Sequence, residues 1–317
     1  MGTTYSVKIT IHPHDWAEAQ QMEAVIRARL DEVERCMSTY NSASELSQFN
    51  LLHTSEPFEV SAATAHVFAM AHQVSAASGG AFDVTVGPLV NAWGFGPEKR
   101  EGVPSDDELA ALRARVGYDK IDVDEARATL RKTRPDVYCD LSAIAKGYAV
   151  DRAAEALEEH GFHDYMVEVG GEVRTAGGNR HSTPWRIGIE KPDAAGRTVE
   201  RVVPMSGQAL ATSGDYRNYY EVDGNRLSHT IDPRTGRPIT HHLASVSVLH
   251  DECAMADAYA TALMVLGPEE GFALAEKLGL AALFIVRDGP GEFLERETTA
   301  FTEYMAEFPA DTSGAEY

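Results

Sequence analysis

Cysteine is scarce in this chain, which has only three among its 317 residues: Cys36, Cys139 and Cys253. They are odd in number, widely spaced, match no zinc-ligand pattern, and each lies beside apolar residues. We therefore expect small core residues rather than metal ligands. The cysteines indicate no particular redox compartment.

Basic residues and long apolar runs are also in short supply. Lys and Arg number 28 against 49 Asp and Glu, which gives a formal net charge of -21. Such a charge argues against nucleic acid as the main partner, because a phosphate backbone attracts a basic surface. An anionic ligand would need a metal ion, helix N-termini or a local Lys or Arg to tolerate this field. No apolar run reaches 18 residues, so no transmembrane helix is expected.

Several catalytic and nucleotide-binding motifs are missing as well. The chain has no Walker loop, no G-x-S-x-G elbow and no H-E-x-x-H. The nearest glycine fingerprint, Gly94-Phe95-Gly96, is followed by Pro97 and does not continue as G-x-G-x-x-G. The pattern therefore argues against a Rossmann dinucleotide site, and a serine hydrolase has no support.

The residues that are present indicate one α+β domain. The composition, 44% hydrophobic and 24% charged, is typical of a globular protein. Helices and strands are interleaved without regular βαβ alternation. We assign 1–308 to the domain and 309–317 to a flexible C-terminal tail. Helices are expected at 15–37, from Ser61 onward, at 105–117, 142–160, 253–265 and 269–278. Strands are expected at 5–11, 121–123, 129–131, 166–169, 185–190, 201–205, 208–212, 245–249 and 281–286.

One helix carries an acidic oxygen and a hydroxyl oxygen four residues apart, on Asp257 and Thr261. That spacing stacks both on one helical face. Two hard oxygen donors on a face otherwise made of Ala, Leu and Met suggest part of a Mg²⁺ site. The alternative is a helix charge beside an ordinary surface threonine.

Two glycine-rich segments, 78–88 and 169–178, allow backbone to approach a ligand closely. In the first, Phe82 could stack on a ring and Asp83 could hydrogen-bond to it. The alternatives are a helix end followed by a strand for the first segment, and a plain hairpin turn for the second.

Segment 140–149 predicts a strand-to-helix junction at which helix N–H groups meet a carboxylate and Lys146. Such a junction binds anions well. The alternative is an ordinary N-cap by Ser142 or Asp140 with Lys146 solvated.

Segment 213–236 places His229 near Asp232. A histidine oriented by a carboxylate can serve as a general base near neutral pH. The alternative is a structural histidine beside an Asp-Pro turn.

Taken in order, these segments resemble the FAD:protein FMN transferase (ApbE) family. The resemblance runs from residue 1 to about residue 267. Its carriers are M-G-T, M-S-T-Y with S-E-L, G-G-A-F-D, D-L-S-A-I-A-K-G-Y-A, V-G-G-E, T-S-G-D-Y, H-T-I-D-P-R-T-G and A-D-A-Y-A-T-A-L-M-V-L-G. It implies a single large ApbE-like, T-fold-related domain with an FAD crevice.

The resemblance also implies residue roles. Flavin-binding positions would be Met1, Tyr40, Ala81, Phe82, Asp83, Asp140, Lys146 and Ile231. Asp257 and Thr261 would bind Mg²⁺, joined by Ala143 through its backbone carbonyl. Asp257 and His229 would be the catalytic residues, His229 by activating the acceptor hydroxyl. Some family members have an acidic residue at the position of Lys146 and a hydroxyl residue at that of Ala143.

The implied activity is Mg-dependent transfer of FMN from FAD to a Thr or Ser hydroxyl of an acceptor flavoprotein, with release of AMP. The alternatives are an FAD pyrophosphatase that yields FMN and AMP, and a non-catalytic FAD-binding protein. The implied acceptors are of the membrane redox subunit type. Membrane attachment is expected only through a missing lipoprotein anchor. The expected location is the periplasm or cell envelope, with a leader absent from this chain, and the cytoplasm is the alternative.

Overall fold

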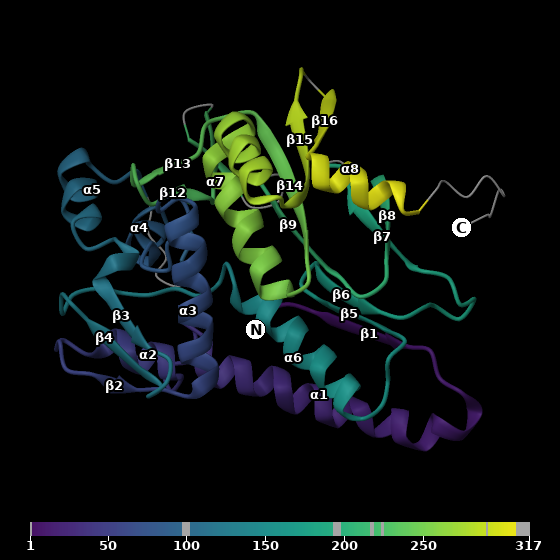
Figure 1. Ribbon diagram of the computed structural model, residues 1–317. Coiled ribbons are helices and arrows are strands. Elements are labelled where there is room, and N and C mark those ends of the chain that lie inside the picture. Colours follow the sequence, from purple (N-terminus) through teal and green to yellow (C-terminus); the bar gives the residue numbers. More distant parts are fainter. Residues whose placement is uncertain are drawn as a thin grey trace.

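A seven-stranded antiparallel sheet runs through the centre of the molecule (Figure 1). The computed structural model describes residues 2–96, 102–192, 198–215, 219–222, 225–289 and 291–308. In spatial order the strands are β1 (Tyr5–Ile9), β5 (Tyr165–Val169), β6 (Glu172–Ala176), β9 (Ala209–Gly214), β14 (Leu243–His250), β15 (Ala281–Arg287) and β16 (Phe293–Glu297). All neighbouring pairs are antiparallel. Strand β14 is buried on both faces, so the sheet is covered on both sides.

Long helices lie on one side of this sheet, and two of them pack directly on it. They are α1 (Trp16–Met37), α3 (Ala62–Ala77), α6 (Ala145–Glu159) and α7 (Cys253–Leu278). Helix α7 packs on β9 and β14, and α6 packs on β5 and β6. Their apolar side chains form the larger core. The other face carries the hairpin of β7 (Trp185–Glu190) and β8 (Val199–Met205) together with α8 (Thr299–Ala306), and a second core fills that interface.

Shorter elements form a lobe beside the helical layer, on the left of Figure 1. The helices are α2 (Glu45–Leu51), α4 (Gly87–Ala92) and α5 (Asp106–Arg113). A small sheet contains β2 (Phe58–Glu59), β4 (Thr129–Lys132) and β3 (Ile121–Asp124). The hairpins β10 (Tyr219–Val222) with β11 (Asn225–Ser228), β12 (Ile231–Asp232) with β13 (Arg237–Pro238), and the 3-10 turns η1 (Pro13–Asp15) and η2 (Tyr118–Lys120) complete the described elements.

The α+β class is confirmed, and each expected strand and helix has a counterpart, most of them with shifted bounds. The helix expected over 142–160 begins at Ala145, because Asp140 accepts the backbone N–H of Ser142 and holds residues 140–144 in a turn. The helix expected over 105–117 ends at Arg113. The expected break between the helices 253–265 and 269–278 is present, because Gly267 has non-helical backbone angles (φ 82°, ψ -176°) and kinks α7 there. Helices α2, α4 and α8 were not expected. The tail 309–317 lies outside the described residues.

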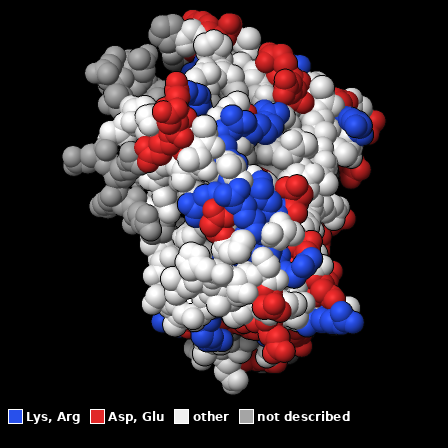
Figure 2. All heavy atoms as spheres, turned by 90° about the vertical axis from the view of Figure 1, so that its left-hand side faces the viewer, with Lys and Arg blue, Asp and Glu red and all other residues white. Residues whose placement is uncertain are grey.

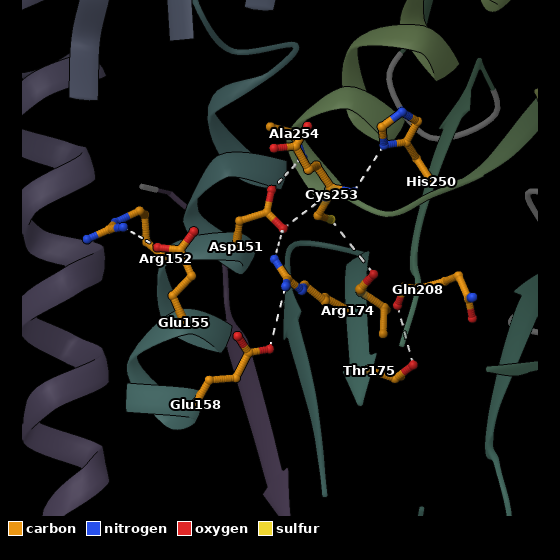
Figure 3. A network of polar contacts seen from close by, with 12 residues as sticks. Asp151, Arg152, Glu155, Glu158, Arg174, Thr175, Gln208, His250, Cys253 and Ala254 are labelled. Carbon is orange, nitrogen blue, oxygen red and sulfur yellow. Dashed lines mark hydrogen bonds and ion pairs between the residues drawn. The ribbon is translucent and has the colours of Figure 1, made fainter. Parts of the chain in front are cut away.

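Helices α6 and α7 cross closely, and a buried polar network joins them (Figure 3). The carboxylate of Asp151 on α6 accepts the backbone N–H groups of Cys253 and Ala254, both at 2.9 Å. These are free donors at the start of α7, so Asp151 caps that helix from outside. Arg174 of β6 donates to Asp151 at 2.9 Å and lies 3.5 Å from Glu158. Burial raises the pKa of Asp151, whereas these N–H groups and Arg174 lower it.

Gly147 makes the crossing possible. A Cβ at this position would lie 2.2 Å from the carbonyl oxygen of Cys253 and 2.7 Å from the Cα of Ala254. Both atoms belong to backbone, which cannot rotate away as a side chain does.

We predict that Gly147→Ala destabilises the protein by about 1–3 kcal/mol or more, as overpacking does. In a helix without this contact, the same change would stabilise the folded state by roughly 0.5–1 kcal/mol. A loss of stability would therefore show that the contact between the two helices outweighs the helix propensity of alanine. Urea unfolding of both proteins measures it. A stability gain would show that the helices are not in contact here.

Candidate active site

A cavity of about 1200 Å³ opens where β6 and β9 separate. These strands pair only at Val173–Leu210 and Arg174–Ala209, although β9 continues to Gly214. Beyond that point the two halves of the sheet diverge. The cavity is lined by the ends of β6 and β9, the start of α6, the middle of α7, strand β7, and loops that include 81–84 and 229–231. We call this cavity the crevice.

Lys146 holds two buried carboxylates together at the floor of the crevice. Its Nζ lies 3.0 and 3.1 Å from the two carboxylate oxygens of Asp257 on α7, and 3.1 Å from Oε1 of Glu172 on β6. The backbone N–H of Gly147 also donates to Asp257 at 3.1 Å. The expected junction of a helix N-terminus, a carboxylate and a lysine therefore exists, but Asp257 supplies its carboxylate. The oxygen Oδ1 of Asp140 binds Ser142 instead.

Charge is poorly balanced in this group. Burial would lower the pKa of Lys146, but the carboxylates of Asp257 and Glu172 raise it. Burial raises the pKa of Glu172 to about 7, with Lys146 opposing and Asp257 adding to the shift. The oxygen Oε2 of Glu172 is buried and has no hydrogen-bond partner. Among the described lining residues Lys146 is the only Lys or Arg. A bound cation would therefore offset negative charge that this one lysine leaves unbalanced.

The predicted Mg²⁺ ligands lie together in this crevice. Asp257 and Thr261 stand one turn apart on α7 and both line the cavity, as does Ala143 before α6. The hydroxyls of Thr261 and Ser213 are 3.3 Å apart. A buried carboxylate, a hydroxyl and a backbone carbonyl are the hard oxygen donors that Mg²⁺ prefers, with water and phosphate completing its shell. Within the described residues no group of three or more His, Cys, Asp or Glu could bind a metal, so such a site would depend on few protein ligands.

Loop 81–84 forms another wall of the crevice. Phe82 is buried in the main core and lines the cavity. Asp83 accepts hydrogen bonds from the N–H and hydroxyl of Thr85 at 2.8 and 2.6 Å and from the N–H of Tyr118 at 2.8 Å. Its carboxylate therefore shapes the loop that presents Phe82. Tyr40 is 74% exposed and also lines the crevice, so its ring is accessible to a ligand.

His229 lies in the crevice with its ring edge-on to Phe95, at 6.3 Å between centroids. The sequence suggested that Asp232 orients this histidine. In the structure the carboxylate of Asp232 accepts hydrogen bonds from Arg234, through the backbone N–H at 2.8 Å and the side chain at 3.0 Å. This ion pair fixes the turn after β12.

The crevice brings together all described residues that the sequence predicted for the site. They are Tyr40, Ala81, Phe82, Asp83, Asp140, Ala143, Lys146, His229, Ile231, Asp257 and Thr261. Met1 lies outside the described residues. The roles of these residues remain predictions. Glu172 was not among the predicted site residues, although the V-G-G-E segment contains it; the available signal was an acidic residue at the start of a largely buried strand.

The molecular surface is not uniformly acidic. Figure 2 shows Lys and Arg side chains gathered on the face that carries the lobe of shorter elements. Acidic partners neutralise several arginines of this lobe, as in Arg134–Asp136 and Arg237–Asp106. Among the described residues, no helix has the length and apolarity needed to span a membrane.

We predict that stability falls as pH rises through the titration of Glu172. The pKa of Glu172, about 7 in the folded protein, exceeds its ordinary value of 4.5. The folded state therefore binds more protons than the unfolded state between these values, and the free energy of unfolding decreases across that window. Thermal unfolding between about pH 5 and pH 8 should show a smaller loss of Tm for Glu172→Gln than for the unmodified protein. Glu269→Gln, which changes an exposed acid on α7, is the control. Equal pH slopes in all three proteins would contradict this assignment.

Comparison with known proteins shows the family to which this chain belongs. The model of the ApbE family matches residues 1–284. The FAD:protein FMN transferase of Vibrio cholerae is 47% identical over 307 residues, which cover 96% of this chain and 91% of the relative. The FAD:protein FMN transferase of Haemophilus influenzae is also 47% identical, over 95% of this chain and 88% of the relative.

A solved structure agrees with these sequence matches. The flavin transferase ApbE from Vibrio cholerae superimposes with a TM-score of 0.87 at 46% identity, covering 96% of each chain. Fold and sequence agree over nearly the whole length, and the chain belongs to the ApbE family.

Proposed function

We propose that this chain is an FAD:protein FMN transferase that moves FMN to a Thr or Ser hydroxyl of an acceptor protein and releases AMP, with Mg²⁺ as cofactor. The observation that carries the proposal is the crevice itself. It brings together Asp257 and Thr261, Lys146, the predicted flavin-binding residues and His229. Family membership and the names of the relatives support the same activity.

The reaction breaks a phosphoanhydride bond of FAD and forms a phosphoester bond to the acceptor. The acceptor hydroxyl oxygen attacks the phosphorus of the FMN half of FAD, and the bond from that phosphorus to the bridging oxygen breaks. AMP leaves with the bridging oxygen, and the hydroxyl proton passes to His229. A hydroxyl is a weak nucleophile and needs such a base. Phosphoryl transfer otherwise depends on positioning and on neutralising charge.

The residues of the crevice floor would neutralise that charge. Asp257, Thr261 and the carbonyl of Ala143 would hold Mg²⁺, which when bound supplies positive charge beside the pyrophosphate oxygens. Lys146 has a second carboxylate partner in Glu172. It therefore keeps a counter-charge when Asp257 binds a cation, and its ammonium stays in place to face a phosphate.

The apolar and aromatic wall made by Phe82, Tyr40 and Ile231 suits the isoalloxazine ring, because ligand pockets are lined mainly by such groups. We further propose that the acceptor is of the membrane redox subunit type and that the chain acts in the periplasm or cell envelope. Both statements depend on the family resemblance alone.

The metal role predicts that Asp257→Asn and Thr261→Val lower covalent FMN labelling of a co-expressed acceptor at least tenfold, because each removes a Mg²⁺ ligand. Flavin fluorescence in a denaturing gel and the added mass of FMN measure labelling. Chelation should abolish labelling by the unmodified protein, and Mg²⁺ should restore it. Glu269→Gln, on the same helix and outside the crevice lining, is the matched control. Labelling that persists in both variants would exclude the metal site.

The base role predicts that His229→Asn lowers the rate constant for labelling by roughly 10²–10⁴-fold, the usual contribution of general acid–base catalysis. The dissociation constant of FAD should change little, since the proton transfer involves the acceptor. Single-turnover labelling and fluorescence titration with FAD separate the two quantities. A loss confined to FAD affinity would make His229 a binding residue. AMP release from FAD without any acceptor, as fast as labelling, would favour the pyrophosphatase.

A further inference from the structure

Strand β7 borders the crevice with four successive residues, Ile187 to Glu190. Side chains in a strand alternate between its two faces. Ile187 and Ile189 point into the second core and are 8% and 2% exposed. The four lining residues have side chains on both faces of the strand. The edge of the strand, rather than one of its faces, therefore borders the crevice.

Pro204 fixes which backbone groups lie on that edge. It pairs with Arg186 in the antiparallel β7–β8 ladder. Proline has no N–H, and the carbonyl of Pro204 accepts the hydroxyl of Tyr304 on α8 at 2.8 Å, so it points away from β7. The Arg186–Pro204 pair is therefore a non-hydrogen-bonded pair.

The alternation then assigns the following residues of β7. Ile187 and Val203 form the hydrogen-bonded pair, and Gly188 opposite Val202 forms the next non-hydrogen-bonded pair. The N–H and carbonyl of Gly188 consequently point away from β8. Among the described strands, β7 pairs only with β8. The peptide groups of Gly188 thus face the crevice, where a second polypeptide could pair with them.

The crevice is larger than a common small-molecule pocket. Its volume of about 1200 Å³ exceeds the roughly 300–1000 Å³ of common small-molecule pockets. The predicted flavin-binding residues lie on other elements, and none is on β7. Tyr40, Phe82 and Ile231 belong to the lobe of shorter elements or to its loops.

We propose that the free edge of β7 captures the acceptor protein as an added β-strand, with Gly188 exchanging two backbone hydrogen bonds with one acceptor residue. This inference rests on the proposed function, since it deepens the description of the same site. Strand addition takes its affinity from main-chain hydrogen bonds. It also fixes the register of the bound segment, which would set its Thr or Ser at the flavin phosphate.

A backbone scan tests the pairing directly. The probe is the nine-residue synthetic peptide with a central threonine that the unmodified protein labels fastest, taken from a randomised peptide library. Each residue is then N-methylated in turn, which removes one N–H without changing the side chain. Labelling should fall at least tenfold when the residue opposite Gly188 is methylated and stay within about threefold for its two immediate neighbours, because neighbouring N–H groups point to opposite edges. A scan without this alternation overturns the proposal.

A pair of variants tests the same edge from the enzyme side. Gly188→Pro removes the N–H that faces the crevice. It breaks no hydrogen bond of the β7–β8 ladder. Gly188→Ala adds a Cβ, which would lie 3.2 Å from Val199, but keeps the N–H. The KM for the peptide should be at least tenfold higher in the proline variant than in the alanine variant. The affinity of both variants for FAD, measured by fluorescence, reports whether the crevice is intact. Equal KM values overturn the proposal.

The outcomes separate this inference from the proposed function. Labelling of folded acceptor proteins without labelling of any peptide would overturn strand capture and leave the transferase standing, since an added strand must act as an isolated segment. Failure to label either would overturn both.

Discussion

The close crossing of α6 and α7 is the constraint on which the candidate site depends. With Gly147 against the backbone of Cys253, Asp257 one turn further along α7 reaches both Lys146 and the N–H of Gly147. Asp151, one turn further along α6, caps the first residues of α7. A side chain at residue 147 would separate the helices, and the carboxylate would then lose the donors that position it.

The separation of β6 from β9 turns this crossing into a site. If the two strands paired along their whole length, backbone hydrogen bonds would fill the gap above the helices. They pair at only two positions, so Glu172 lines the opening and its Oε2 has no partner. Two buried carboxylates then share one lysine. An unpaired buried charge is costly, and a bound cation is a direct way to offset it in a chain with a net charge of -21.

The sequence predicted what depends on local pattern. Alternation gave the strand 185–190 with its observed bounds, and the spacing of Asp257 and Thr261 placed both on the crevice side of one helix. It could not predict the partners of Lys146, because Asp257 is 111 residues away along the chain. Glu172 was overlooked for the same reason, since its environment depends on where two distant strands stop pairing. The start of α6 was misplaced because Ser142 is a good capping residue, yet Asp140 uses it to close the preceding turn.

Binding of the phosphate and binding of the acceptor would use different kinds of group in the crevice. Charged side chains of α6, α7 and β6 surround the place where phosphate would lie, whereas Gly188 of β7 offers uncharged backbone. Backbone pairing is little affected by the net charge of either partner, so a strongly acidic protein could bind an acceptor without attractive long-range electrostatics. A paired strand also has a fixed register. Pairing at Gly188 would therefore determine which hydroxyl of the acceptor reaches His229. The histidine itself would not distinguish one threonine from another.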